Sequence, residues 1–210
     1  MLIAGAKGFA KEILEILHQN NQLENLVFYD DINTYDSNYL FDKFRILNSD
    51  IQAQEYFKTI DNKFTVGIGN PALRNKLNQK FTDLGGVLVS TISKYAEIGS
   101  YNVNIRIGCN ILSGVKISND VTIGKANIIY YNSVITHDVV VGDFCEISPS
   151  VNILGNVIIG DYCKIGTGAI LFPNVILGHN VVVGAGAVVR ESFPSNVTVA
   201  GVPAKIIKTV

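Results

Sequence analysis

Aliphatic residues recur at every sixth position through the second half of this 210-residue chain, and this repeat constrains the fold more than any other feature. Steps of six reach fifteen consecutive aliphatic positions: Ile105, Ile111, Ile117, Ile123, Ile129, Ile135, Val141, Ile147, Ile153, Ile159, Ile165, Leu171, Leu177, Val183 and Val189. Chance would not produce such a run, because aliphatic residues fill only about a quarter of positions in globular chains. Glycine often follows the aliphatic residue, and valine often stands two positions before it.

A period of six fits neither an α-helix nor the simple alternation of an exposed strand. It indicates a short strand, a turn and a corner, with one inward aliphatic side chain on each face. Three hexads close a triangular coil of 18 residues, so the fifteen hexads make five coils, and Ile92 and Ile98 add most of a sixth. With strands about 4.8 Å apart, the prism is roughly 25–30 Å tall. The handedness of this prism does not follow from the general rule that connections between parallel strands are right-handed.

The first part of the chain follows a different pattern, in which short apolar strands alternate with helices. Strands are expected at residues 1–5, 26–29 and 64–69, and helices follow the first and third of them, to about residue 20 and over residues 71–81. This alternation predicts a small parallel sheet. We therefore expect an α/β domain over residues 1–85 and a parallel β-helix with a C-terminal tail over residues 86–210.

Composition excludes several classes of protein. The chain is 48% hydrophobic and 17% charged with a net charge of −1, so neither nucleic acid nor an anionic membrane is expected as a partner. The opening Met1-Leu2-Ile3-Ala4-Gly5 lacks the basic start and the cleavage site of a signal peptide, and no apolar run approaches the roughly 18 residues of a membrane span. We expect a cytoplasmic protein.

The three cysteines indicate packing and no metal. Their number is odd and no CxxC occurs, which favours a reducing compartment without a structural metal. Whole coils separate Cys109, Cys145 and Cys163, so the three are expected to stack in one inner column with Asn127 and Val181. Such thiols are core residues in preference to nucleophiles.

The repeat ends in Val199-Ala200-Gly201-Val202-Pro203-Ala204-Lys205, and with this segment the chain resembles the hexapeptide-repeat acyltransferases. Over nearly its whole length it is similar to the sialic-acid and bacillosamine-type sugar O/N-acetyltransferase family. The resemblance implies a left-handed β-helix preceded by a Rossmann-like nucleotide-sugar-binding domain. It also implies acetyl-CoA as co-substrate and a homotrimer with active sites between subunits. Four residues are expected beside CoA: Gly201, Pro203, Ala204 and Lys205. Lys205 either contacts a phosphate of CoA or is simply solvated.

The glycine-rich turn after the first strand is a candidate for substrate binding. A dinucleotide fingerprint that begins at Gly5 would need glycines where Lys7 and Ala10 stand, so NAD is not indicated. The free N–H groups of the following helix can still face an anion or a polar ring. We expect Gly5, Lys7 and Gly8 to contact the acceptor.

Asp30 and Asp31 end the second expected strand, where acidic residues can contact a ribose or a base. In the resembled family this crevice holds a UDP-type nucleotide, and the pair matches the family's acidic residues. The alternative is two solvated carboxylates at a strand end.

His137 is the candidate catalytic base. Acyl transfer from a thioester needs a base for the nucleophile's proton and a donor for the developing oxyanion. His137 stands two positions after the inward Ile135, so it lies at a corner or an outer face. The resemblance assigns it the catalytic role and gives Asp138 the task of orienting the imidazole. Neighbouring side chains on a strand point in opposite directions, so their contact requires a turn. An ordinary exposed histidine is the alternative.

Gly155 stands one coil after His137, so its N–H is expected one strand spacing away. The family match makes it the oxyanion donor, beside the CoA thioester. A turn that requires a positive φ would equally explain this glycine. The family often has a second histidine nine residues after the first, and Glu146 occupies that position here. His179 lies on a different face from His137, and the remaining His18 falls in the other domain, so no three-histidine zinc site is expected.

The resemblance implies acetyl-CoA-dependent N-acetylation of a nucleotide-linked amino sugar, such as a UDP-linked 4-amino sugar, in surface glycan biosynthesis. The same residues would also serve O-acetylation of a sugar such as sialic acid. A noncatalytic sugar-binding or assembly protein on the same scaffold is a third reading.

Overall fold

The computed structural model describes residues 1–209, and the chain divides into two compact units, Met1–Thr91 and Ile92–Val210. The sequence pattern placed this division at residue 85. Within the described residues no helix is long and apolar enough to cross a membrane.

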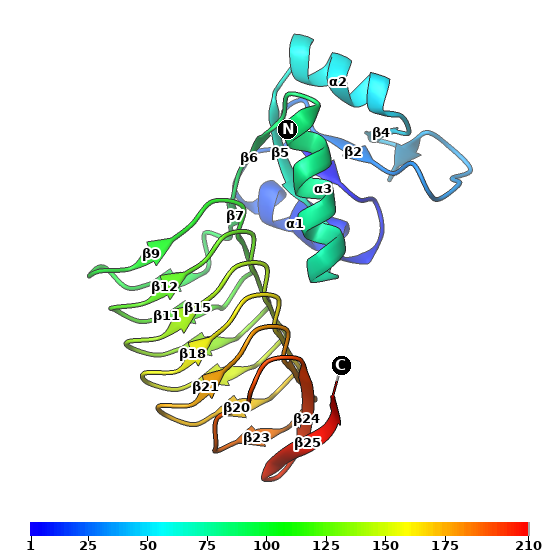
Figure 1. The fold of residues 1–210 in the computed structure, drawn as a ribbon. Coiled ribbons are helices and arrows are strands. Elements are labelled where there is room, and N and C mark those ends of the chain that lie inside the picture. The colour runs from blue at the N-terminus through cyan, green and yellow to red at the C-terminus, as the bar shows by residue number, and fades with distance from the viewer. Residues whose placement is uncertain (210) are drawn as a thin grey trace. The chain divides into compact units, whose positions relative to one another are not determined.

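The N-terminal unit is built on a six-stranded sheet in the order β3-β4-β2-β1-β5-β6. Figure 1 labels four of these strands, β2, β4, β5 and β6. Its strands are β1 (Leu2–Ala4), β2 (Val27–Tyr29), β3 (Tyr39–Leu40), β4 (Phe44–Leu47), β5 (Lys63–Val66) and β6 (Val87–Leu88). Its helices are α1 (Gly8–Gln19), α2 (Asp50–Thr59) and α3 (Pro71–Asp83). Only β3 pairs in the antiparallel sense, so the expected parallel sheet is confirmed.

Local sequence signals explain where the last two helices begin. The side chain of Ser49 accepts a hydrogen bond from the Gln52 N–H at the start of α2. The Asn70 side chain does the same for the Leu73 N–H, and Pro71 occupies the first turn of α3. The capping oxygens favour both helix starts because each satisfies an N–H that would otherwise be free. Proline favours the start of α3 because it has no N–H that needs a partner.

The two faces of this sheet carry separate cores. Ile3 and Phe28 pack on one face with three buried residues of α1, Ala10, Ile13 and Leu17. Their strand neighbours Ala4 and Tyr29 pack on the other face, with Phe57 and Phe81 among their partners. This alternation follows from the opposite directions of successive side chains on a strand.

The second unit is a left-handed β-helix with three parallel sheets. One contains β7 (Thr91–Ile92), β10 (Asn110–Ile111), β13 (Ile128–Ile129), β16 (Glu146–Ile147), β19 (Lys164–Ile165), β22 (Val182–Val183), β24 (Val197–Gly201) and the antiparallel β25 (Ala204–Thr209). The second contains β8 (Glu97–Ile98), β11 (Lys116–Ile117), β14 (Val134–Ile135), β17 (Asn152–Ile153), β20 (Ile170–Leu171) and β23 (Val188–Val189). The third contains β9 (Asn104–Ile105), β12 (Thr122–Ile123), β15 (Val140–Val141), β18 (Ile158–Ile159) and β21 (Ile176–Leu177).

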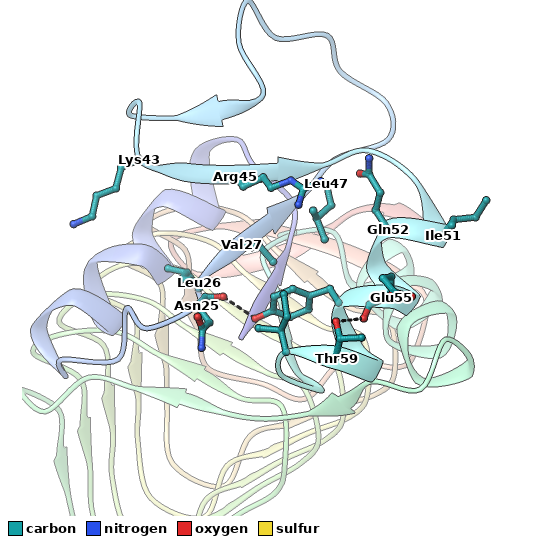
Figure 2. A pocket seen from close by; sticks show the side chains of 12 residues that line it. Asn25, Leu26, Val27, Lys43, Arg45, Leu47, Ile51, Gln52, Glu55 and Thr59 are labelled. Carbon is teal, nitrogen blue, oxygen red and sulfur yellow. Dashed lines mark hydrogen bonds between the residues drawn. The ribbon is translucent and has the colours of Figure 1, made fainter.

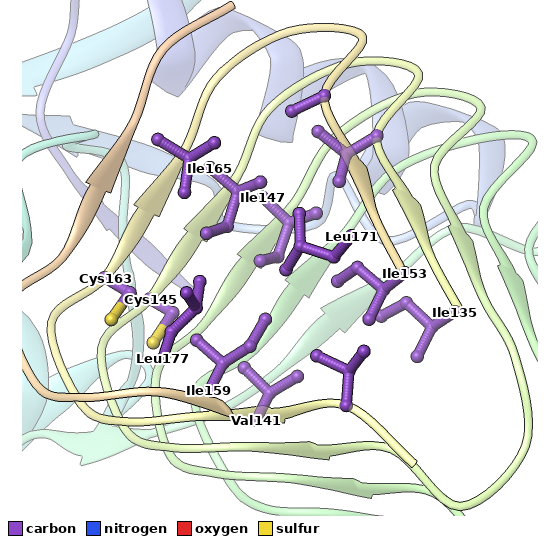
Figure 3. Close-up of a cluster of buried hydrophobic side chains, with 14 of the residues drawn as sticks. Ile135, Val141, Cys145, Ile147, Ile153, Ile159, Cys163, Ile165, Leu171 and Leu177 are labelled. Carbon is purple, nitrogen blue, oxygen red and sulfur yellow. The ribbon is translucent and has the colours of Figure 1, made fainter. Parts of the chain in front are cut away.

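The inward aliphatic residues fill this prism, as the hexad pattern predicts (Figure 3). The side chains of Ile135, Ile147 and Ile159 are each at most 1% exposed. Backbone bonds join successive coils, such as that from the Thr136 N–H to the Ile153 carbonyl at 2.9 Å. Every sixth residue from 102 to 186 has a positive φ, so each corner is made by one left-handed residue.

Candidate active site

His137 lies at the corner between β14 and β15, next to the left-handed residue Asp138. The φ of Asp138 is 59°, which breaks the strand alternation and brings the two side chains together. His137 Nδ1 lies 2.7 Å from Asp138 Oδ2, and both side chains are more than half exposed. The turn that this contact requires is therefore present.

The contact determines which ring nitrogen carries the proton. A carboxylate only accepts hydrogen bonds, so Nδ1–H of His137 donates to Asp138. In the neutral imidazole this leaves Nε2 unprotonated with a free lone pair, which is the state a general base needs.

Gly155 lies beside the imidazole, one coil farther along. The Asn156 N–H donates to the His137 carbonyl at 3.2 Å, which fixes the two corners side by side. A Cβ built on Gly155 would come within 2.5 Å of His137 Cε1 and 2.9 Å of Nε2. The φ of Gly155 is not in the left-handed region, so the alternative of a turn glycine with positive φ is wrong. Space for the imidazole requires glycine here.

The Gly155 N–H has no acceptor within residues 1–209. An unpaired N–H next to a base is a suitable donor for an oxyanion. A trough of about 530 Å³ opens beside His137, over β8, β11 and β14. Its lining includes Thr136, Ser118 and the Lys116–Glu97 ion pair, whose Nζ and Oε1 are 2.7 Å apart.

The expected CoA residues lie in the β24–β25 hairpin. Pro203, Ala204 and Lys205 line a depression of about 240 Å³ together with Arg190 and Glu191. Lys205 Nζ is 2.7 Å from Glu191 Oε1, so Lys205 is paired, although its side chain is 66% exposed. No residue lines both this depression and the trough beside His137.

Gly201 sits at the end of β24 with a φ of 102°, a conformation that favours glycine. It therefore serves the turn of the hairpin.

The glycine turn follows β1. Gly5 has a φ of 125°, and its N–H donates to the Tyr29 carbonyl at 2.8 Å. A Cβ on Gly5 would lie 2.9 Å from the Gly67 carbonyl oxygen, so the chains at the ends of β1 and β5 approach closely. Lys7 precedes α1, which begins at Gly8, and its Nζ lies 4.6 Å from the Tyr35 ring centroid.

Asp30 holds the loop that follows β2. Its carboxylate accepts hydrogen bonds from the backbone N–H groups of Ile32 and Asn33, the Asn33 amide and the Tyr35 hydroxyl. Burial raises its pKa, but these hydrogen bonds outweigh burial and hold the pKa below the usual value. Tyr35 therefore links Asp30 to Lys7.

Asp31 belongs to a separate charged cluster. Its Oδ2 accepts from Lys80 Nζ at 2.8 Å and from the Tyr29 hydroxyl at 2.9 Å. Lys80 also lies 2.7 Å from Asp50. Burial raises the pKa of Asp31, and the contacts with Lys80 and Tyr29 lower it by more. Asp30 and Asp31 are thus bonded within the protein, which differs from two solvated carboxylates.

Tyr35 and Lys80 were not identified from the sequence. A tyrosine five residues after Asp30 is a weak signal, and no local pattern connects Lys80 with β2 across about fifty residues.

The remaining candidates are structural. The thiols of Cys109, Cys145 and Cys163 are buried and donate to carbonyl oxygens at 3.1 Å, as expected for packed residues. His179 Nδ1 lies 3.0 Å from the Asp161 N–H in another corner column. Within residues 1–209 no three or more His, Cys, Asp or Glu side chains gather as a metal site. Glu146 lies on β16.

Comparisons with known proteins agree with this architecture. Residues 1–81 match the PglD N-terminal domain family, and residues 138–173 match the bacterial transferase hexapeptide family (six repeats). No curated protein sequence matches the chain.

Solved structures match nearly the whole chain. A variant of perosamine N-acetyltransferase from Caulobacter crescentus, in complex with CoA and GDP-perosamine, is 30% identical, with a TM-score of 0.89, and the match covers 99% of this chain and 96% of that one. WeeI from Acinetobacter baumannii AYE is also 30% identical, with 98% of each chain covered and a TM-score of 0.88. The acetyltransferase domain of PglB from Neisseria gonorrhoeae FA1090 is 26% identical, with 98% of each chain covered and a TM-score of 0.89. The chain therefore belongs to the family of hexapeptide-repeat sugar acetyltransferases that carry a PglD-type N-terminal domain.

Proposed function

We propose that this chain transfers an acetyl group from acetyl-CoA to the amine of a nucleotide-linked sugar. The observation that carries the proposal is the His137–Asp138 pair, with the unpaired Gly155 N–H one coil away. The related structures support the reactants, since one is in complex with CoA and GDP-perosamine and the PglB domain is in complex with acetyl coenzyme A.

The reaction follows from this geometry. Nε2 of His137 takes a proton from the sugar amine as its nitrogen attacks the thioester carbonyl, and Asp138 stabilises the resulting imidazolium. The Gly155 N–H donates to the oxyanion of the tetrahedral intermediate. When the intermediate collapses, the C–S bond breaks and the thiolate of CoA takes the proton from the imidazolium. The products are the amide and CoA.

The nucleotide end of the acceptor is proposed to bind the N-terminal unit. The glycine turn offers the N–H groups of α1, and anions and polar rings bind well at such a helix start. The loop held by Asp30 brings Tyr35 next to Lys7, so both can contact the nucleotide. Asp31 follows the same strand, β2, and is proposed to contact the nucleotide as well.

CoA is proposed to contact the β24–β25 hairpin of the β-helix. The residues proposed there are Gly201, Pro203, Ala204 and Lys205.

We further propose a homotrimer. The outward column Val140, Ile158 and Ile176 on the third sheet is 42%, 43% and 50% exposed. A flat apolar face of this kind needs cover, and closed cyclic symmetry is the usual way to supply it. Neighbouring prisms would then both contribute to the acetyl-CoA site. Light scattering at working concentration should show a trimer, and a species of about 23 kDa would contradict this assembly.

Release of the CoA thiol, measured across several acceptors, tests the activity. We expect turnover with GDP- or UDP-linked 4-amino sugars and none when the sugar amine is replaced by a hydroxyl. Turnover with sialic acid would instead indicate sugar O-acetylation, the alternative activity that the sequence left open. No CoA release with any acceptor would contradict catalysis and favour a noncatalytic role.

A further inference from the structure

A groove of about 470 Å³ lies between β4 and α2 in the N-terminal unit (Figure 2). Its floor is apolar and is made by the buried side chains of Leu26, Val27, Leu47 and Tyr56. Pockets of about 300–1,000 Å³ with an apolar lining and a few polar groups are typical of small-molecule sites. None of the glycine-turn or acidic-pair residues lines this groove.

The way α2 packs leaves the groove open. Its buried residues are Ala53, Tyr56 and Phe57, and the Phe57 ring packs against the rings of Phe64 and Phe81. The helix therefore covers the part of the sheet near β5, and a groove stays open on the side near β4.

Exposed apolar side chains stand at the margin of the groove. Ile51 and Ile60 line it and are 81% and 56% exposed. Burial of such side chains against a ligand is favourable by about 25 cal/mol per Å² of apolar surface.

Two cations stand along one margin of the groove. Lys43 and Arg45 project from the β4 side, opposite the α2 side chains of Gln52 and Glu55 (Figure 2). Neither cation forms an ion pair within residues 1–209. Elsewhere in the chain several cations do form ion pairs with carboxylates, namely Lys80, Lys116, Lys205 and Arg106. Arginine in particular binds carboxylate and phosphate through two parallel hydrogen bonds.

We propose that this groove binds a small amphiphilic anion, with its apolar body on the floor and its carboxylate or phosphate at Arg45 and Lys43. None of the residues that line the groove is among those proposed for acetyl transfer, and the inference does not depend on the proposed function. Carboxylate and phosphate share the chemistry that the two cations recognise, so the test includes both.

Isothermal titration with decanoate and with decyl phosphate, each below its micelle concentration, tests the site. At least one probe should bind saturably with one molecule per chain, and decanol should bind more weakly because it lacks the charge. Arg45→Gln should weaken binding about tenfold or more, the usual effect of losing a charged hydrogen bond. The control is Lys58→Gln, which removes an exposed cation of α2 outside the groove.

A second pair of variants tests occupancy of the groove without relying on charge loss. Glu55→Trp should fill the groove and reduce binding at least fivefold, although removal of a carboxylate would by itself favour an anion. Gln54→Trp, at an exposed position of α2 outside the groove, should leave binding unchanged.

Three results would overturn the proposal. The first is no saturable binding of either probe up to about 1 mM, the weak end of specific affinity. The second is equal weakening by Arg45→Gln and Lys58→Gln. The third is displacement of the probe by GDP or UDP, which would place it in the nucleotide crevice.

Discussion

The two units of the chain place their candidate functional residues by different means. In the β-helix the period alone puts Gly155 beside His137, because one coil separates them and every coil has the same path. In the N-terminal unit the acidic pair is positioned by contacts that no period describes, such as that between Asp31 and the distant Lys80. A repeat therefore allows a site to be located by counting, whereas a non-repetitive domain reveals its site only through packing.

The cores differ in the same way. Each coil of the β-helix contacts only its neighbours, with one inward residue per face, as in other solenoids. The N-terminal core instead joins aromatic rings from several elements, with Tyr29 and Phe81 4.9 Å apart and Phe64 and Phe81 5.6 Å apart. We infer that the β-helix supplies the fixed geometry of the reaction, and that the N-terminal unit supplies a shaped binding loop.

This comparison is most strongly tested at His137. We predict that His137→Ala lowers kcat by about 10²–10⁴, the usual contribution of a general base, while the fold is retained because the side chain is exposed. Steady-state release of the CoA thiol measures the effect, and circular dichroism checks the fold.

His179→Ala is the matched control. His179 also stands two positions after an inward residue, at another corner of the prism, so it has the same local geometry without the same neighbours. Its kcat should stay near that of the unmodified protein. A His137→Ala protein that keeps more than half of the original turnover would remove His137 from the mechanism.

The next largest effect is expected at Gly155. The added methyl group of Gly155→Ala would meet His137 Cε1, so the imidazole or the backbone must move. Alanine keeps the backbone N–H, but room for its methyl group requires the imidazole or the N–H to move from its position. We predict a fall in kcat of about 10²–10³, the size expected when an oxyanion donor is misplaced.

A double-mutant cycle separates the two roles of Gly155. If Gly155→Ala acts only by displacing the imidazole, it should have no further effect in a His137→Ala background. A residual fall in kcat in that background would show that the methyl group also acts apart from the imidazole, as expected if it moves the N–H away from the oxyanion. An unchanged kcat for the single variant would show that neither role holds.

The sequence predicted much of the β-helix because a single period determined it. The inward column, the stacked cysteines and the position of His137 outside the prism interior all follow from counting hexads. The contact between His137 and Asp138 could not be derived in this way, because it depends on the positive φ of Asp138. Phe144 and Tyr162 also occupy left-handed corners, where bulky residues are rare, so residue type alone does not reveal them.

Residues 32–63 show the limit of prediction in the N-terminal unit. The structure places β3, β4 and α2 there, and the sequence pattern indicated none of them. Helix α2 buries only Ala53, Tyr56 and Phe57, so its apolar face is short. The Ser49 cap was a usable signal for its start. The groove beside α2 depends on tertiary packing and had no local signal.

The acidic pair tests the N-terminal half of the comparison. Asp30→Ala combined with Asp31→Ala should raise KM for the nucleotide sugar and leave KM for acetyl-CoA nearly unchanged. The loss of one or two hydrogen bonds costs about 1–3 kcal/mol, or roughly 5- to 150-fold in affinity. Isothermal titration with each ligand measures the separation.

Single variants then show how the pair acts. Asp31→Asn keeps the shape of the side chain, and Lys80→Gln removes its charged partner. If Lys80→Gln reproduces the full effect of Asp31→Asn, Asp31 acts through the cluster and not through the ligand. Equal weakening toward both ligands would indicate general damage, and unchanged sugar binding would remove the pair from the nucleotide site.

The smallest effect is expected on the stability of the N-terminal unit when the pH is lowered. The pKa values of Asp30, Asp31 and Asp50 are all held below the ordinary value, the last chiefly by its contact with Lys80. Because the folded pKa lies below the unfolded value of about 3.9, each carboxylate stabilises the fold above about pH 4. That stability is lost as the pH falls through the folded pKa. The loss should be modest for Asp31 and Asp50, because their pairs with Lys80 are partly exposed and solvent screens them.

Calorimetric unfolding between pH 6 and pH 3 should therefore show the transition of the N-terminal unit move to lower temperature below about pH 4. Lys80→Gln removes the contact that holds down the pKa of Asp31 and Asp50, so this variant should unfold earlier at neutral pH and depend less on acid. Carboxyl NMR titration should show both pKa values rise in the variant. An acid dependence identical in the two proteins would mean that the Lys80 cluster does not govern this unit's response to pH.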